Sequence, residues 1–231
     1  MNQRIEIVKQ FIKENMGHEY EAHDYLHAFR VLKNGQDIIK QMLNSDECQQ
    51  IDINQDVIYT ACLVHDFVDQ KLFTDIGIQI EKLVKLLEEN QYTKDEIEEI
   101  LYIINNISYS KGMIPNSLNG KIVQDADRLD ALLSVGVLRP FTYGTKHDRP
   151  MYDDPLSSLS HYIEKKLKLE GMLNTQGARQ ICKDKAQITY IYLAYLLDEL
   201  PDDIYEKHTF GKELEEFYQK YNDILPEFLR R

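Results

Sequence analysis

The sequence predicts an all-α protein, and three observations lead to this prediction. Apolar residues recur at helical spacing along most of the chain, with a clear stripe from Ile76 to Leu87. A strand-like alternation of apolar and polar residues between turn signals does not occur. No segment has the composition of an interdomain linker. We therefore expect residues 1–231 to form one domain, with core motifs at 18–135 and C-terminal helices at 156–223 packed on them.

Helices are expected wherever the apolar stripes continue without a breaker. The stripe at 97–104 is preceded by Thr93 and Glu96, which have the spacing of a capping box. Gly, Pro and Asn residues predict loops at 110–116 and 139–155, and the second is long enough to cover a site. The remaining helices are expected near residues 3–15, 20–44, 55–69, 120–137, 156–172, 178–200 and 210–223.

Composition and charge restrict the class of protein. Hydrophobic residues make up 43% and charged residues 29% of the 231 residues, which is typical of a globular chain. The net charge of −12 argues against binding of nucleic acid polymers and of anionic membranes, whereas a phosphorylated small molecule fits a locally basic pocket. Three separated cysteines and the lack of an apolar run of membrane-spanning length favour a reducing, cytoplasmic location.

The first candidate site residue is His27. It lies four residues before Val31, on the apolar stripe of its expected helix, and therefore points inward. Asp24 and Arg30 flank it on the same side. Two interpretations fit: a core histidine hydrogen-bonded to Asp24, and a metal ligand.

An adjacent pair, His65-Asp66, follows the apolar run from Val57 to Val64. A buried carboxylate without a partner is costly, and a metal ion that binds both side chains removes that cost. The alternative is that the helix reaches the surface here and that the pair starts a solvated turn continued by Asp69 and Lys71.

A third stretch places Asp127 on one helix face with Val123 and Ala131, and Asp130 lies alongside. Acidic residues near a helix N-terminus are an alternative explanation. The spacing of Asp125, Asp127 and Asp130 does not follow the calcium-binding EF-hand loop.

Together the three stretches supply two imidazoles and two carboxylates from three helices, in the order H…HD…D. This order resembles the HD superfamily of metal-dependent phosphohydrolases. The segments HDYLHAFRV, ACLVHDFVDQK and KIVQDADRLDAL resemble their counterparts in a group of small stand-alone bacterial HD hydrolases. The segments FTYGT and SLSHYIEKKLKL are similar to that group too, so the resemblance spans about residues 18–190. It implies an HD-type helical bundle.

The resemblance also implies the metal ligands. They are His27, His65, Asp66 and Asp127. Asp127 is preferred to Asp125 because the family's last ligand follows an alanine and precedes a leucine by two positions. Two departures from the family pattern, Tyr25-Leu26 and 132–134, touch no ligand but can reshape the pocket.

A mixed nitrogen and oxygen ligand set suits Mn²⁺ first, and also Mg²⁺, Fe²⁺, Co²⁺ or Ni²⁺, better than a closed structural zinc site. Members of the superfamily with two metals carry additional histidines after the HD pair. This chain has no histidine between His65 and His147, so we expect one metal ion.

Five further residues are candidates for chemistry on a phosphate. Asp69 lies one helical turn after His65 and can orient or deprotonate the attacking water, or it is a surface partner of Lys71. Lys71 and Arg128 can neutralise phosphate charge. His161 and Lys165 share a helix face and can contact substrate, or they belong to an exposed ion-pairing face.

The resemblance implies hydrolysis of a nucleotide. The leading hypothesis is a pyrophosphohydrolase that converts a (deoxy)nucleoside triphosphate into monophosphate and diphosphate. The alternatives are a 5′-nucleotidase or other phosphomonoesterase, and a module that binds metal and nucleotide without turnover. The base, the sugar, the native metal and the oligomeric state are not encoded in any recognisable motif.

Overall fold

The computed structural model describes residues 3–16, 24–44, 52–69, 73–108, 112–152, 154, 156–201 and 211–229. These residues form helices and the turns between them, and no strand occurs among them. The all-α prediction is therefore confirmed. The chain divides into two compact units, which are described separately: residues 1–127 with 174–178, and residues 128–173 with 179–231.

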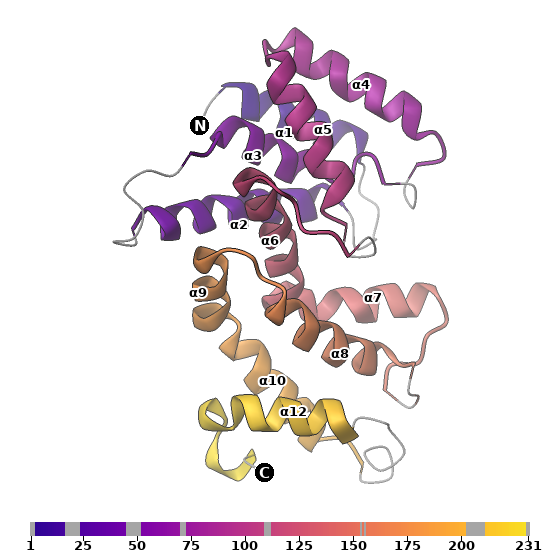
Figure 1. Ribbon diagram of the computed structural model, residues 1–231. Coiled ribbons are helices and arrows are strands. Elements are labelled where there is room, and N and C mark those ends of the chain that lie inside the picture. Colours follow the sequence, from indigo (N-terminus) through magenta and orange to yellow (C-terminus); the bar gives the residue numbers. More distant parts are fainter. Residues whose placement is uncertain are drawn as a thin grey trace. The chain divides into compact units, whose positions relative to one another are not determined.

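The first unit is built around α3 (Gln55–Val64), which packs against three other helices: α1 (Gln3–Asn15), α2 (Tyr25–Leu43) and α5 (Lys94–Asn106) (Figure 1). Nearly every side chain of α3 after Asp56 is buried, because the helix is apolar on all sides. The unit also contains α4 (Ile76–Glu89) and the first part of α6 (Leu118–Leu132).

Single polar residues cap the N-termini of these helices. Asp24, Asn54 and Asp75 each accept a hydrogen bond from a backbone N–H in the first turn of α2, α3 and α4. Thr93 and Glu96 form both hydrogen bonds of the expected capping box at the start of α5.

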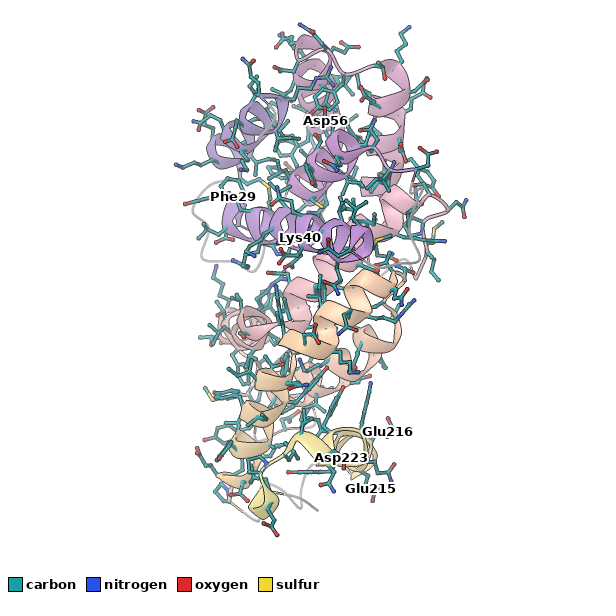
Figure 2. All side chains as sticks on the ribbon, turned by 90° about the vertical axis from the view of Figure 1, so that its left-hand side faces the viewer. Phe29, Lys40, Asp56, Glu215, Glu216 and Asp223 are labelled. Carbon is teal, nitrogen blue, oxygen red and sulfur yellow. The ribbon has the colours of Figure 1, made fainter. Side chains whose placement is uncertain are left out.

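The second unit starts within α6 and continues through a 3₁₀ helix, η2 (Ser134–Val137), into α7 (Leu138–Lys146) and α8 (Ser158–Gly171), which pack against each other. The later part of α9 (Gln176–Lys185), α10 (Gln187–Asp198) and α12 (Gly211–Tyr221) complete it, with two 3₁₀ helices, η3 (Asn222–Ile224) and η4 (Glu227–Leu229). Three exposed acidic residues gather on α12 and η3: Glu215, Glu216 and Asp223 (Figure 2).

The loop expected at 139–155 is wrong in its first half, where α7 lies. Pro140 is the third residue of α7, a position where the backbone N–H has no partner within the helix, so proline is tolerated there. The helix expected at 120–137 ends at Leu132 and continues only as η2. The helix expected at 178–200 is interrupted at Ala186.

The boundary between the two units lies between Asp127 and Arg128, inside α6. A continuous helix carries the chain across this boundary, so no linker composition marks it in the sequence. The expectation of one domain over residues 1–231 stays a prediction. No helix of the described part of the chain is long and apolar enough to cross a membrane.

Candidate metal centre

The ring of His27 points into the first unit from the first turn of α2. The side chain of Asp24 accepts a hydrogen bond from the backbone N–H of His27 at 2.8 Å, so Asp24 caps the helix. The imidazole is buried, and its Nε2 lies 3.1 Å from Nε2 of His65. Asp24 therefore accepts a hydrogen bond from the backbone of His27, and the ring of His27 lies beside the ring of His65.

His65 and Asp66 come directly after α3, which ends at Val64. Both residues are only 7% exposed, which contradicts their interpretation as the start of a solvated turn. Nδ1 of His65 lies 2.9 Å from the carbonyl oxygen of Cys62. Because a carbonyl oxygen only accepts, Nδ1 carries the proton of this hydrogen bond and Nε2 is directed to the site.

Asp127 reaches the same place from α6, whereas Asp125 does not belong to the group. Oδ1 of Asp127 lies 3.4 Å from Nε2 of His27 and 3.8 Å from Nε2 of His65. The carboxylate of Asp125 is fully buried and accepts hydrogen bonds of 2.7–3.0 Å from the backbone and side chains of Asn174 and Thr175. It anchors α6 to the start of α9 within the first unit.

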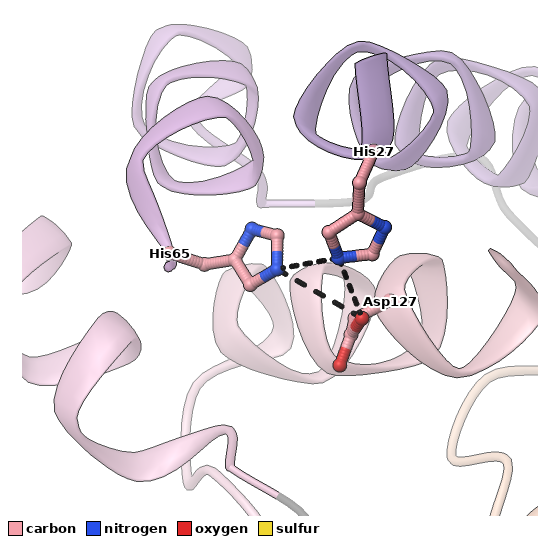
Figure 3. A group of neighbouring side chains, drawn as sticks. All are labelled: His27, His65 and Asp127. Atoms are coloured by element: carbon pink, nitrogen blue, oxygen red, sulfur yellow. Dashed lines mark hydrogen bonds and ion pairs between the residues drawn. The ribbon is translucent and has the colours of Figure 1, made fainter. Parts of the chain in front are cut away.

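Donor atoms of His27, His65 and Asp127, from three parts of the chain, thus lie within 4.8 Å of one another (Figure 3). Oδ2 of Asp66 lies 3.4 Å from Nε2 of both histidines. Ligand atoms bound to one ion at about 2.1 Å are separated by about 3.0 Å at a right angle and about 3.4 Å in a tetrahedron. The distances of 3.1–3.8 Å that join the two histidines to each other and to the two carboxylates are therefore of the size that one ion requires.

The electrostatics of the group fit a divalent cation. Burial lowers the pKa of His65, but the carboxylates of Asp66 and Asp127 outweigh it and raise this pKa to about 9. Burial raises the pKa of Asp127, but the imidazoles of His27 and His65 hold it well below its usual range. Two carboxylates keep two negative charges in a largely buried site, and a divalent ion with two neutral imidazoles balances them.

The four side chains of the metal centre differ in their exposure to solvent. The side chains of His27, His65 and Asp66 are 1%, 4% and 10% exposed, whereas that of Asp127 is 31% exposed. The group is therefore most accessible to solvent at Asp127. Among the described residues, His27, His65 and Asp127 are the group of three such ligands that could hold an ion, and the expectation of one ion stays a prediction.

Close packing between helices keeps the ligands in place. Gly35 on α2 faces Cys62 on α3, and a Cβ at position 35 would lie 3.0 Å from the sulfur. The buried Asn34 donates a hydrogen bond of 3.0 Å from Nδ2 to the carbonyl oxygen of Ala126, next to Asp127. These contacts fix α2, which carries His27, against the elements that carry His65 and Asp127.

The other candidates for the chemistry are placed as follows. Asp69 is half-buried in the turn after α3, and its backbone N–H donates to the carbonyl oxygen of Asp66 at 3.1 Å. Lys71 lies outside the described residues. Arg128 is buried, and its guanidinium donates to the carbonyl oxygen of Met172.

His161 and Lys165 lie one helical turn apart on α8 in the second unit, where His161 is exposed and Lys165 half-buried. The catalytic roles of Asp69, Lys71 and Arg128 stay predictions, and so do the substrate-binding roles of Lys71, Arg128, His161 and Lys165. Sequence reasoning missed Asn34, Gly35 and the carbonyl of Cys62, which support the ligands. A buried polar residue or a glycine inside an otherwise regular apolar helix is the signal that could have indicated the first two.

Comparisons with known proteins identify the family of this chain. The family model of the HD domain matches residues 24–132. An HD-superfamily hydrolase from Bacillus thuringiensis, known as a crystal structure, is 32% identical, with 85% of this chain and 94% of that chain covered and a TM-score of 0.63. The chain therefore belongs to the HD superfamily of metal-dependent phosphohydrolases.

Two further relatives are similar over nearly their whole length. YpgQ of Bacillus subtilis is 28% identical over 200 residues, which cover 85% of this chain and 93% of YpgQ. The crystal structure of YpgQ in complex with ADP matches with a TM-score of 0.70, 26% identity and coverage of 85% and 98%. The Lin1889 protein from Listeria innocua is 28% identical with a TM-score of 0.67, covering 87% of this chain and 100% of that chain.

Proposed function

We propose that this protein is a nucleotide pyrophosphohydrolase that converts a (deoxy)nucleoside triphosphate into a monophosphate and diphosphate. The observation that carries the proposal is the convergence of His27, His65, Asp66 and Asp127 on one open-sided group. The complex of the related YpgQ with ADP supports a nucleotide as the ligand.

One divalent ion, Mn²⁺ in the first place, is the proposed cofactor. Carboxylate oxygens and imidazole nitrogens in equal number suit Mn²⁺, and Mg²⁺, Fe²⁺, Co²⁺ or Ni²⁺ as substitutes. When bound, such an ion lowers the pKa of water and neutralises charge on a phosphoryl group. The side of the group next to Asp127 leaves room for these oxygens because Asp127 is the most exposed of the four.

The chain's own residues have distinct tasks in this proposal. The hydrogen bond from His65 to the carbonyl of Cys62 orients the imidazole and keeps Nε2 available for the ion. Asp69 accepts the proton of the attacking water at its carboxylate, from a turn that is tied by its backbone to Asp66. Lys71 and Arg128 are proposed to neutralise the charge of the phosphate groups.

The proposal is tested by incubating the Mn²⁺-loaded protein with a panel of nucleoside tri-, di- and monophosphates and separating the products. Release of diphosphate from triphosphates is the expected result. Release of single phosphates from monophosphates would replace the proposal with a phosphomonoesterase. Nucleotide binding without turnover with any divalent metal would replace it with a non-catalytic binding module.

A further inference from the structure

Aromatic and basic side chains gather where α7 ends and α8 begins, in the second unit. We call this area the α7–α8 basic surface and define it by Tyr143, His147, Arg149, His161 and Lys165. The two helices lie side by side in this unit (Figure 1). None of these residues belongs to the metal centre, and three of them were not candidates from the sequence.

The backbone between the two helices is firmly tied, which fixes Arg149. Gly144 on α7 is buried so closely against Ser158 on α8 that a Cβ at position 144 would overlap the hydroxyl of Ser158. The backbone N–H of Arg149 donates to the carbonyl of Gly144 at 2.9 Å. The N–H of Ser158 donates to the carbonyl of Pro150, also at 2.9 Å. Arg149 therefore leaves a rigid turn between the two helices.

The side chain of Arg149 lies against an aromatic pair. The rings of Tyr143 and His147 are stacked, with centroids 3.9 Å apart and planes 16° from parallel. The guanidinium carbon of Arg149 lies 5.7 Å from the centroid of Tyr143. Such a cation–π contact holds the charge in position without neutralising it. Tyr143 is 44% exposed, so the pair also presents ring surface to the solvent.

Two more basic side chains, those of His161 and Lys165, lie on α8. Ser158, His161 and Lys165 are three and four residues apart and share one face of the helix. The pKa of His161 is lowered by burial in the first place, then by the positive charges of Lys165 and Arg149. The acidic neighbour Glu164 forms an ion pair with Lys168. His161 therefore lies in a locally positive field on a chain whose net charge is −12.

This distribution of charge suits an anion that is small and polyvalent. The exposed acidic residues Glu215, Glu216 and Asp223 lie on α12 and η3 (Figure 2), and two exposed acids, Asp148 and Glu164, lie among the basic side chains of the α7–α8 basic surface. The guanidinium of Arg149 and, one helical turn apart on α8, the imidazole of His161 and the ammonium of Lys165 provide charge and directed N–H donors for phosphate oxygens. A flat aromatic pair next to them provides a surface on which a nucleobase can stack.

We propose that Arg149, His161 and Lys165 form a binding site for the phosphate groups of a nucleoside di- or triphosphate, with the Tyr143–His147 pair as the surface for its base. The nature of the ligand rests on the proposed function of the protein. The existence of a phosphate-binding site at these residues does not depend on hydrolysis, and it can be tested separately.

The experiment uses the full chain freed of metal by a chelator and titrates it with ADP, with inorganic pyrophosphate and with adenosine in separate calorimetric runs. Arg149→Ala and Lys165→Ala should each weaken the binding of ADP and of pyrophosphate about tenfold, the loss typical of one charge-assisted hydrogen bond. Lys183→Ala, a change of an exposed lysine on α9, is the matched control and should bind as the wild type does. Tyr143→Ala should weaken the binding of ADP but not that of pyrophosphate.

A second readout is local to the site. The pKa of His161, followed by the NMR shifts of its ring protons and assigned with His161→Gln, should rise when pyrophosphate is bound, because a nearby negative charge favours the imidazolium. A pKa unchanged at saturating pyrophosphate would overturn the proposal. So would wild-type affinity in both Arg149→Ala and Lys165→Ala, or the absence of any ADP and pyrophosphate binding by the wild type at millimolar concentration.

The outcomes separate this proposal from the proposed function. If the metal-loaded protein hydrolyses triphosphates and the two variants bind ADP and pyrophosphate as the wild type does, only the phosphate site is wrong. If the variants lose ADP binding but the wild type hydrolyses nothing, only the proposed pyrophosphohydrolase activity is wrong.

Discussion

At the scale of single residues, the ligands of the metal centre owe their direction to contacts that do not involve the ion. The imidazole of His65 is held by the carbonyl of Cys62, and His27 stands in the first turn of a helix that Asp24 caps. Replacing Asp66 therefore removes a donor atom while these two contacts remain.

The proposed role of Asp69 is specific to one proton transfer. Asp69→Asn keeps the size of the side chain but removes its basicity, so kcat should fall about 100-fold or more while the Mn²⁺ content per chain stays the same. Steady-state kinetics and elemental analysis measure the two quantities. Asp95→Asn, at an exposed acid in the first turn of α5, serves as the control. An unchanged kcat in Asp69→Asn would show that this carboxylate is not the base.

Lys166 makes the stability of the protein depend on pH. Its ammonium is buried and donates to the carbonyl of Leu132 at 2.6 Å and to the hydroxyl of Thr189 at 2.8 Å. Burial lowers the pKa of Lys166 from 10.5 to about 7. Between these values the unfolded chain binds a proton that the folded chain lacks, so the free energy of unfolding rises with pH through this window.

Below pH 7 both states are protonated and the full cost of the buried charge is present. Lys166→Met removes this cost, so its free energy of unfolding should rise less than that of the wild type between about pH 7 and pH 9.5, with a difference of a few kcal/mol. Urea unfolding followed by circular dichroism over this range measures it. Parallel pH profiles of the two proteins would contradict the assignment.

At the scale of elements, the centre depends on how closely α2, α3 and α6 approach each other. Gly35 allows α2 to lie against the fully buried Cys62 of α3, and Asn34 ties α2 to α6 through the carbonyl of Ala126. A displacement of α2 by a few tenths of an ångström moves His27 relative to the other ligands.

Gly35→Ala is therefore expected to lower both stability and metal affinity. The added methyl group would lie 3.0 Å from the sulfur of Cys62, and overpacking of this kind costs about 1–3 kcal/mol, which exceeds the gain of about 1 kcal/mol from helix propensity. Gly171→Ala is the matched control, since nothing lies within 4 Å of a Cβ there. Thermal unfolding and Mn²⁺ titration compare the two variants. Equal stability and equal affinity would show that α2 and α3 have room to adjust.

Sequence reasoning succeeded where one short pattern determines the structure. The capping box at Thr93 and the burial of the apolar run before His65 depend on nearest neighbours along the helix, so the sequence shows them directly. It failed at α7, because Pro140 and Gly144 read as loop signals although both are tolerated at the positions they occupy in this helix. The anchoring of Asp125 by Asn174 and Thr175 joins residues about fifty positions apart, which no local pattern predicts.

At the scale of the whole molecule, the acidic surface limits the partners of the protein. With a net charge of −12 the chain repels polyanions, while Lys165 and Arg149 create a positive local field at His161. A single nucleotide can use such an area, whereas a nucleic acid polymer requires an extended basic face.

The protein is accordingly expected not to retain single- or double-stranded DNA or RNA at physiological salt, while it binds free ADP under the same conditions. Fluorescence polarisation with labelled oligonucleotides and with labelled ADP measures both. Sub-micromolar binding of any of these polymers would show that the net charge of the chain does not exclude nucleic acid as a partner.

The central claim is that His27, His65, Asp66 and Asp127 hold one divalent ion, and the metal content of the purified chain tests it most directly. After loading with Mn²⁺ and removal of the free ion, elemental analysis should find one ion per chain in the wild type and close to none in Asp66→Ala, with unchanged helical circular dichroism in both. One full equivalent of Mn²⁺ retained by Asp66→Ala, or two ions per wild-type chain, would contradict it.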